Sequence, residues 1–486
     1  MADILLTTIN ARFRHTAFGL RCLLANLDEL AQRAEILEFD LEKTPAEMAE
    51  AILAHQPRIV GLGVYVWNAD LSRRLVQVLK SLHPELIIVV GGPEVSHDIA
   101  GQIITSLANH VIVGEGELLL RTLCRRLLAG EQAIEKICAA PPPDPDQLLP
   151  AYALYSERDI QQRVIYVEAS RGCPFKCAFC LSALEQGVRH FALEPFLAAM
   201  ENLWQRGVRH FKFVDRTFNL KITTAQAILD FFHARLTPDL FLHFEVIPDR
   251  FPEPLRASVA RFPAGTIQFE IGLQSFSAEV LARIDRPQEM TRAVENLSWL
   301  RNHTGVHLHT DLIIGLPGED MTGFAAGFDR LIGLDPHEIQ VGILKRLRGA
   351  PIQHQIEPFR MVFDPEPPYE LLCNDRIDFM TMRRLRRFAR YWDLIGNSGR
   401  FAKTRPGLLG EQSPFAQFMA LSDWLFATTG QTHRIALPRL YDLVQTGLVQ
   451  ALGCDPGLAA EMIHADRSRS HTGQGPERQA RHSGFA

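Results

Sequence analysis

Short apolar runs alternate with amphipathic stretches over residues 4–129. The runs predict strands, and stretches with an apolar residue every three to four positions predict helices. The strands are expected at Ile4–Thr8, Ala34–Phe39, Ile59–Val66, Leu86–Val90 and Val111–Val113. The helices are expected at Leu20–Arg33, Pro45–His55, Ala69–Leu82, Ile99–Ala108 and Glu117–Ala129. Five strand–helix repeats favour an α/β fold with a parallel, doubly wound, Rossmann-like sheet over residues 1–138.

A second series of strand and helix patterns begins after a Pro-rich stretch at 139–160, which predicts a linker. Amphipathic stretches such as Phe196–Gln205 and Ala225–Ala234 predict helices between its strands. Six strands are expected, at Val164–Ala169, His210–Val214, Leu242–Val246, Thr266–Gly272, Val306–Ile314 and Ile339–Leu344. Six repeats predict a partial (β/α)6 barrel over residues 161–356, with its chemistry at the carboxyl ends of the strands.

The strand signal fades after residue 357. Apolar periodicity then predicts helices at Tyr369–Tyr391 and Pro414–Ala427, and a mostly helical extension over residues 357–463. Residues 464–486 are rich in Arg, Ser, Gly and His and lack apolar periodicity, so we expect a disordered tail there.

The composition is that of a globular protein, with 47% hydrophobic and 22% charged residues. Lys and Arg number 51 against 56 Asp and Glu, a balance that favours neither nucleic acid nor an anionic membrane as a partner. The first residues lack the pattern of a signal peptide, and no apolar run is long enough to span a bilayer. We therefore expect a cytoplasmic protein without a membrane partner or a nucleic-acid partner.

Three of the eight cysteines, Cys173, Cys177 and Cys180, lie within eight residues. Thiolates at this C-x-x-x-C-x-x-C spacing can hold three corners of an iron–sulfur cube and leave the fourth iron open. The alternatives are a zinc site, which wants a fourth ligand although the nearest histidine is His190, or three unrelated thiols. The five scattered cysteines are expected to be buried small side chains: Cys22, Cys124, Cys138, Cys373 and Cys454.

With the aromatic Phe179 before its third cysteine, this motif resembles that of the radical SAM superfamily. The resemblance covers Val164–Leu347. It implies a 4Fe–4S cluster on the three cysteines whose open iron binds S-adenosylmethionine. It further implies an electron donor such as flavodoxin or ferredoxin, and a 5′-deoxyadenosyl radical that abstracts hydrogen from a substrate the sequence does not name.

Later strand ends extend the resemblance. It implies that Asp215 contacts the methionine moiety, that Glu270 and Gln274 contact the ribose or the amino acid, and that the backbone near Ile314 packs on adenine. The alternative for each residue is the ordinary turn chemistry of a strand end.

The first domain lacks a G-x-G-x-x-G motif after its first strand, which counts against a dinucleotide. Its candidate binding residues lie at later strand ends instead: Gly63, Gly91, Gly92, Gly114, Glu115 and Gly116. Glycine there lets a bulky ligand approach the backbone, although tight turns also use glycine. In the order of its domains, the chain resembles cobalamin-binding radical SAM proteins over residues 3–130. That resemblance implies a cobalamin, against which Tyr65–Asn68 could pack, unless Trp67 belongs to the core.

The resemblance implies methyl transfer to an unactivated carbon as the leading reaction, with ring formation or rearrangement as alternatives. An RNA methylthiotransferase-like enzyme would need a second cysteine triad, and the first domain offers only Cys22 and Cys124. A non-enzymatic iron–sulfur sensor is a third possibility. Families with a histidine beneath the cobalt use Asp-x-His-x-x-Gly, a motif that Phe13–Gly19 does not match, so we expect His15 not to ligate cobalt.

The region after residue 357 resembles a helical extension of unknown function attached to one branch of these proteins. Its basic run, Arg383–Arg390, could contact RNA or an acidic substrate. The alternative is a solvated helix face paired with Asp and Glu.

Overall fold

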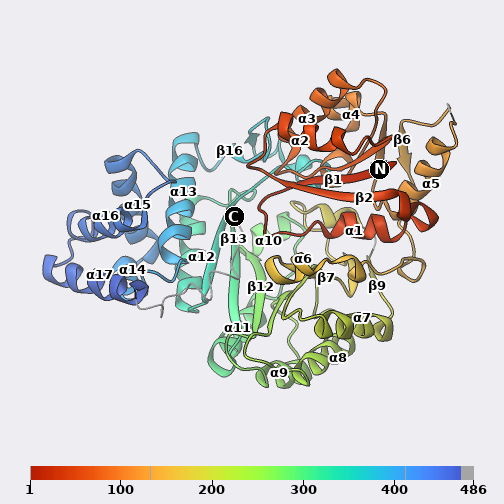
Figure 1. Ribbon diagram of the computed structural model, residues 1–486. Coiled ribbons are helices and arrows are strands. Elements are labelled where there is room, and N and C mark those ends of the chain that lie inside the picture. Colours follow the sequence, from red (N-terminus) through yellow and green to blue (C-terminus); the bar gives the residue numbers. More distant parts are fainter. Residues whose placement is uncertain (1, 132, 186, 411, 472–486) are drawn as a thin grey trace.

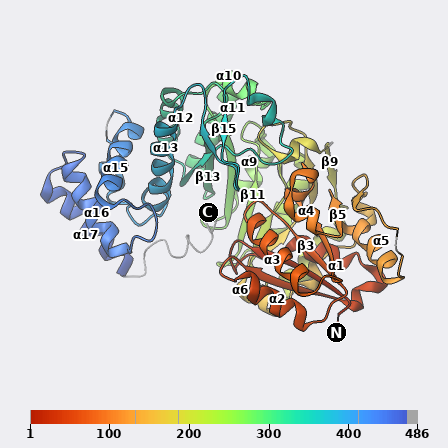
Figure 2. The same ribbon diagram turned by 90° about the horizontal axis from the view of Figure 1, so that it is seen from above.

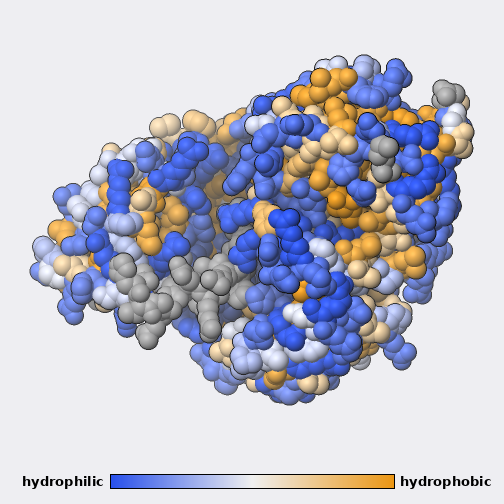
Figure 3. Space-filling model, in the orientation of Figure 1, coloured by the Kyte–Doolittle hydropathy of each residue, from blue (hydrophilic) through white to orange (hydrophobic). Residues whose placement is uncertain are grey.

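The computed structural model describes residues 2–131, 133–185, 187–410 and 412–471 (Figure 1). An N-terminal α/β domain, a central barrel and a helical C-terminal extension follow one another along the chain. Figure 2 shows the extension and the N-terminal domain on opposite sides of the barrel. Figure 3 shows hydrophobic patches over the N-terminal domain. None of the described helices is both long and apolar enough to cross a membrane.

The N-terminal domain is a parallel sheet in the order β2-β1-β3-β4-β5-β6, as a doubly wound fold requires. Its strands are β1 Ile4–Asn10, β2 Ala34–Asp40, β3 Ile59–Gly63, β4 Ile87–Gly91, β5 His110–Val113 and β6 Ile137–Ala139. Its α-helices are α1 Phe18–Ala25, α2 Pro45–Ala54, α3 Ala69–Leu82, α4 Ile103–Leu107 and α5 Glu117–Leu128. Helices α2, α3 and α4 cover one face, and α1 and α5 cover the other. The predicted helix Leu20–Arg33 ends early, at Ala25, and a 3₁₀ turn, Asp28–Arg33, follows.

The central domain is an open parallel barrel in the order β14-β13-β12-β11-β10-β7, with β7 and β14 as its edges. The partial barrel expected from the sequence is therefore confirmed. Its strands are β7 Ile165–Val167, β10 His210–Phe213, β11 Phe241–Glu245, β12 Ile267–Gln274, β13 His307–Ile314 and β14 Glu338–Ile343. Its helices are α7 Leu193–Gln205, α8 Ile222–His233, α9 Glu253–Ala260, α10 Ala278–Arg283, α11 Met290–His303 and α12 Met321–Gly333. Helix α6 Glu157–Gln162 precedes β7. The hairpin formed by β8 Ser170–Cys173 and β9 Gly187–His190 follows β7.

The extension begins with the hairpin β15 Val362–Phe363 and β16 Leu371–Cys373. Helices follow: α13 Phe379–Tyr391, α14 Arg405–Leu409, α15 Pro414–Thr429, α16 Leu437–Gln450 and α17 Pro456–His471. The expected helix Tyr369–Tyr391 is wrong in its first half, because residues 371–373 pair as a strand and the helix starts only after Asp378, whose side chain caps it.

The expected disordered tail is also wrong where the structure describes it. Helix α17 continues to His471, and the buried carboxylate of Asp466 accepts hydrogen bonds from the backbone N–H groups of Lys403 and Thr404, each at 2.9 Å. Residues 472–486 of that prediction lie outside the described residues.

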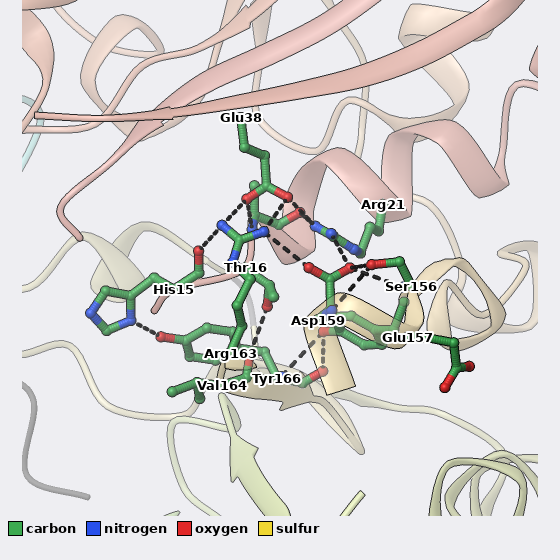
Figure 4. Close-up of polar contacts among 12 residues, drawn as sticks. His15, Thr16, Arg21, Glu38, Ser156, Glu157, Asp159, Arg163, Val164 and Tyr166 are labelled. Atoms are coloured by element: carbon green, nitrogen blue, oxygen red, sulfur yellow. Dashed lines mark hydrogen bonds and ion pairs between the residues drawn. The ribbon is translucent and has the colours of Figure 1, made fainter. Parts of the chain in front are cut away.

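The N-terminal domain docks onto the barrel through buried ion pairs (Figure 4). Glu38 of β2 pairs with Arg21 of α1 and with Arg163, which precedes β7, each at 2.8 Å. Asp159 of α6 completes the group, at 2.8 Å from Arg21 and 3.0 Å from Arg163. Two arginines and two carboxylates thus balance one another where the domain meets the segment that enters the barrel.

Two further contacts orient the domain. Glu94 follows β4 and pairs at 2.9 Å with Arg348, which follows β14. Glu115 follows β5 and pairs at 2.9 Å with Arg171, which follows β7. The loops at the carboxyl ends of the N-terminal sheet therefore meet the loops at the carboxyl ends of the barrel strands.

Candidate functional site

The three clustered cysteines lie at the carboxyl end of the barrel, where Cys173 ends β8 and Cys177 and Cys180 follow in the next loop. All three line one cavity of about 170 Å³. In the described part of the chain, no three His, Cys, Asp or Glu side chains gather closely enough to hold a single metal ion. An iron–sulfur cube takes each thiolate on a different iron, so it does not require the three thiols to meet at one ion.

Three of the predicted contact residues, Phe179, Glu270 and Gln274, line the same cavity, and Asp215 and Ile314 do not. The buried carboxylate of Asp215 accepts hydrogen bonds from the backbone N–H of Ala169 at 3.0 Å and from Ser170 Oγ at 2.6 Å. Burial raises its pKa to about 7. Asp215 therefore holds the start of the β8–β9 hairpin, which contains Cys173.

The backbone at Gln274 is strained. Its φ of 70° lies in the left-handed region, next to an irregularity in the β12–β13 register. The side chain folds back toward Gly272, where an added Cβ would lie 2.3 Å from its Nε2. This conformation turns Gln274 toward the cysteines, which strand alternation alone would not predict.

Buried polar atoms around the cavity lack hydrogen-bond partners among the described residues. They include Gln274 Oε1, an acceptor, and Gln288 Nε2, a donor. Orphaned buried atoms of both kinds fit a cavity built for a polar ligand. The sequence reasoning did not select Asp311 or Gln288; the only signal for Asp311 was its alternation with His307 and His309 along β13.

Ionisable side chains of the barrel interior adjoin the cavity, and two of them, Glu245 and Glu270, line it. His243 Nε2 lies 3.0 Å from Glu270 Oε2, and Lys212 Nζ lies 4.0 Å from the same oxygen. Although burial opposes it, the hydrogen bond with His243 lowers the pKa of Glu270 to about 2. Burial lowers the pKa of Lys212 to about 8 and raises that of Glu245 to about 7. Two groups of this lumen therefore titrate near neutral pH.

The predicted glycines of the N-terminal domain lie at neighbouring ends of its parallel strands. Gly63 ends β3, Gly91 ends β4 and Gly116 precedes α5. Gly92 has a φ of 109°, and an added Cβ would lie 2.5 Å from the carbonyl oxygen of Val64, so close packing of two loops requires glycine there.

Other groups at these strand ends differ in their surroundings. Gly114 also has a positive φ, of 79°, but no described atom lies within 4 Å of its missing Cβ. The carboxylate of Glu115 is held by Arg171 and Arg189. Trp67 is 48% exposed and stacks on Tyr65, with ring centroids 4.4 Å apart, so the alternative that it belongs to the core is wrong.

His15, in the loop after β1, faces the barrel (Figure 4). Its Nδ1 lies 2.6 Å from the hydroxyl oxygen of Tyr166 in β7. Burial lowers the pKa of His15 to about 4, so the ring is neutral at pH 7. A polar contact already occupies one of its nitrogens.

The remaining thiols and the basic run were also placed by the structure. Cys22 and Cys124 are buried as expected, whereas full burial is wrong for three half-buried thiols: Cys138, Cys373 and Cys454. Three arginines of the basic run form ion pairs, which supports the solvated-face interpretation. The pairs are Arg384–Asp423 at 2.6 Å, Arg386–Glu370 at 3.1 Å and Arg390–Asp393 at 2.8 Å.

Three family models match the chain in sequence. A B12 binding domain covers residues 4–123, the radical SAM superfamily covers residues 167–329, and a protein region of unknown function, DUF4080, covers residues 357–475. The chain therefore carries a B12-binding domain followed by a radical SAM domain. These domains confirm the expected cofactors: cobalamin, S-adenosylmethionine and a 4Fe–4S cluster.

Curated relatives and solved structures agree with these matches. The 2-(S-pantetheinyl)-carbapenam-3-carboxylate methyltransferase of Streptantibioticus cattleyicolor is 27% identical, over 63% of this chain and 49% of its own. The cobalamin-dependent radical SAM methyltransferase TokK of Streptomyces tokunonensis is 24% identical, over 66% of this chain and 52% of its own. The chain thus spans about half the length of these curated relatives. The structure of the radical SAM methyltransferase TsrM from Kitasatospora setae, with cobalamin and a [4Fe-4S] cluster bound, shares the fold with a TM-score of 0.62 at 16% identity. That match covers 97% of this chain and 100% of that one.

Proposed function

We propose that this protein is a cobalamin-dependent radical SAM enzyme that transfers a methyl group to an unactivated carbon of its substrate. The observation that carries the proposal is the contact between the carboxyl ends of the strands of the B12-binding domain and those of the barrel strands. The cysteine cavity opens at the carboxyl end of the barrel, and ion pairs hold the glycine-rich strand ends of the B12-binding domain against that end. Methyltransferases among the similar proteins support the choice of reaction.

Different residues at the cavity would bind the cluster and S-adenosylmethionine. Cys173, Cys177 and Cys180 would hold three irons, and Gln274 would satisfy its orphaned oxygen on a donor group of S-adenosylmethionine. When bound, the cluster supplies the electron that cleaves S-adenosylmethionine, and cobalamin supplies a methyl carrier.

Other groups tune the surroundings of the cysteines. Arg286 donates a hydrogen bond to Cys177 Sγ at 3.4 Å, which places a positive charge beside the thiolates. Lys212 and Glu245, whose pKa values lie near 8 and 7, can hold or release a proton beside the cavity at neutral pH. Asp215 keeps the hairpin in place.

In the B12-binding domain, the open backbone at Gly114 and the exposed ring of Trp67 would face the corrin. Gly63, Gly91 and Gly116 lie at the neighbouring strand ends. His15 contacts Tyr166, so we infer that the protein places no histidine beneath the cobalt. The proposal includes a cytoplasmic location and an electron donor such as flavodoxin or ferredoxin.

Anaerobic reconstitution tests the cysteine assignment. The wild-type protein should carry about four irons per chain and form 5′-deoxyadenosine from S-adenosylmethionine, whereas Cys177→Ala should lose the cluster because only two thiolates remain. The matched control is Cys373→Ala, which removes a half-buried cysteine of the extension and should keep iron and cleavage. Full iron content and cleavage activity in Cys177→Ala would contradict the proposal.

A further inference from the structure

The first hairpin of the extension, β15–β16, contacts both of the other parts of the chain. Figure 1 shows β16 between helix α13 and the N-terminal domain, although the helices of the extension lie across the barrel from that domain. The backbone N–H of Leu371 in β16 donates to the carbonyl oxygen of Leu344, just after β14, at 2.8 Å. Arg346 N–H donates to the carbonyl oxygen of Tyr369 at 3.0 Å. The barrel therefore fixes the backbone of the segment that carries Tyr369.

The side chain of Tyr369 connects this hairpin to the B12-binding domain. Its hydroxyl group donates a hydrogen bond to Glu94 Oε1, and Arg348 Nε donates to the same oxygen at 2.9 Å. Arg348 Nε also donates to the Tyr369 hydroxyl oxygen at 3.0 Å. Glu94 is 5% exposed and Tyr369 is 2% exposed. Because water has little access to them, Glu94 Oε1 depends on the tyrosine and the arginine for its hydrogen bonds.

The backbone of Tyr369 is held in an unfavourable conformation. Its φ of 59° lies in the left-handed region, which costs free energy for a residue with a large side chain. Such a conformation persists only where the surroundings hold it. Here the hydrogen bonds with Arg346, Arg348 and Glu94 do so, and the ring also lies 5.0 Å from the guanidinium carbon of Arg348.

Glu94 belongs to the loop after β4, and this loop ties together two strand ends that are candidates for binding cobalamin. Ser96 Oγ donates a hydrogen bond to the carbonyl oxygen of Gly92 at 2.9 Å and accepts one from the backbone N–H of Gly114 at 3.2 Å. Gly114 is the position where the backbone is open to a ligand. A displacement of Glu94 would therefore also move the loop that holds Gly92 and Gly114.

We propose that Tyr369 is a positioning residue for cobalamin: through Glu94, it holds the loop after β4 in the conformation that binds the cofactor. If that conformation is populated only in part, the affinity falls by the same fraction, so the contact raises the affinity for cobalamin. Because linkage is reciprocal, bound cobalamin in turn stabilises the hairpin of the extension. This inference rests on the proposed function only for the use of cobalamin as a methyl carrier, and it gives the extension a task at a cofactor site in another domain.

Titration with hydroxocobalamin tests the contact in the full-length protein with its reconstituted cluster. Tyr369→Phe removes the hydroxyl group but keeps the ring beside Arg348. It should raise the Kd for hydroxocobalamin about tenfold, the loss expected for one hydrogen bond to a buried charged group. The matched control is Tyr391→Phe, at a fully buried tyrosine of the extension whose hydroxyl group donates to the carbonyl oxygen of Gln431 at 2.6 Å. The control should change this Kd less than about twofold.

A double-mutant cycle shows whether Glu94 carries the effect. Glu94→Gln keeps the shape of the side chain, removes its charge and should also raise the Kd. Because both changes break the same contact, the double variant should bind at most about twofold more weakly than the weaker of the two single variants. Multiplication of the two single effects would show that Tyr369 and Glu94 act independently, which would overturn the proposal.

Hydrogen exchange separates positioning from a role in folding the hairpin. In the wild type, saturating hydroxocobalamin should slow exchange at residues 94–97 and also at residues 369–373, there about tenfold, because the coupling is equal in both directions. In saturated Tyr369→Phe, the slowing at residues 94–97 should persist and that at residues 369–373 should be lost. A hairpin that needs the hydroxyl group only to fold would exchange faster with and without cobalamin, at an unchanged Kd, and this would overturn the proposal.

Two further results would overturn it: equal slowing at residues 369–373 in Tyr369→Phe and the wild type, or no binding of hydroxocobalamin by the wild type. None of these measurements requires a substrate. A protein that binds cobalamin with this dependence on Tyr369 but transfers no methyl group would contradict only the proposed function, and would leave the positioning role in place.

Discussion

The barrel is joined to its two neighbours by opposite kinds of interface. The N-terminal domain has two apolar cores of its own, one on each face of its sheet, and meets the barrel through buried ion pairs around Glu38. The extension has no such separate core among the described residues, because one continuous apolar cluster runs from Tyr152 through the barrel to Ile463.

Aromatic rings form the centre of the second interface. Phe328 of α12, a barrel helix, lies 5.1 Å from Phe388 and 4.9 Å from Trp392 of the extension, measured between ring centroids. Phe388 in turn lies 4.9 Å from Phe415 of α15. The difference shows that the extension completes the barrel as one folding unit, whereas the N-terminal domain is a separate unit, docked by ion pairs and by the stacking of Phe18 on Tyr152 and Tyr155.

The largest expected effect is at the shared core. Phe388→Ala should lower the free energy of unfolding by about 3–5 kcal/mol, because it leaves a cavity in a fully buried aromatic cluster. Hydrogen exchange should accelerate in β13 and β14 as well as in the extension, and remain unchanged in β3 and β4. Phe379→Ala, at a 48% exposed position on the same helix, is the control and should have little effect. Exchange confined to the extension would show that the two parts do not share a core.

A smaller effect is expected at the ionic interface. Glu38→Gln leaves Arg21 and Arg163 facing a neutral amide and should weaken docking by about 1–3 kcal/mol. Proteolysis within the linker at 139–160 should become faster, while exchange in β3 and β4 stays constant. Glu29→Gln, which breaks an exposed pair with Arg125, should change neither rate. Equal acceleration of exchange in β3 and β4 would argue against a separately folded domain.

The smallest expected effect is a pH dependence at the ionic interface. Burial lowers the pKa of His15 from 6.5 to about 4, so its contact with Tyr166 contributes fully above pH 6.5 and is lost as the pH falls toward 4. Although burial opposes them, Arg163 and Arg21 lower the pKa of Glu38, so its contribution is present above pH 4.5 and lost in more acidic solution. The rate of hydrogen exchange near Tyr166, corrected for the intrinsic rate, should therefore rise as the pH falls from 6.5 to 4.5. A His15→Gln variant with the same rise would exclude this histidine as the cause.

The sequence predicted both parallel sheets because strands buried on two faces read as apolar runs. It missed β6 and β16 for different reasons. Residues 137–139 form a three-residue edge strand with Ile137 47% exposed, too short and too exposed to give a pattern. Residues 371–373 merged with the helical periodicity that follows, and only their pairing with β15 identifies them as a strand.

The site was predictable where one segment carries it. The three cysteines lie within eight residues, so their sequence spacing alone predicts that the thiols share one loop. Asp215 is also at a strand end, but its side chain turns to Ser170, a direction that no spacing encodes. Gln288 and Asp311 come to the cavity from different segments, and such meetings arise only when the barrel folds.

The continuous core of barrel and extension also has a consequence for synthesis on the ribosome. The N-terminal domain can fold as soon as its sheet has emerged, but the barrel core is complete only when Ile463 has followed, about 300 residues after β7 begins. At ordinary rates of translation this delay lasts roughly 15 to 60 s. Throughout that interval Cys173, Cys177 and Cys180 belong to an unfinished barrel and remain accessible to metal delivery and to oxidants. Conditions that slow translation past residue 180 should therefore increase the exposure of these thiols before the extension encloses the barrel.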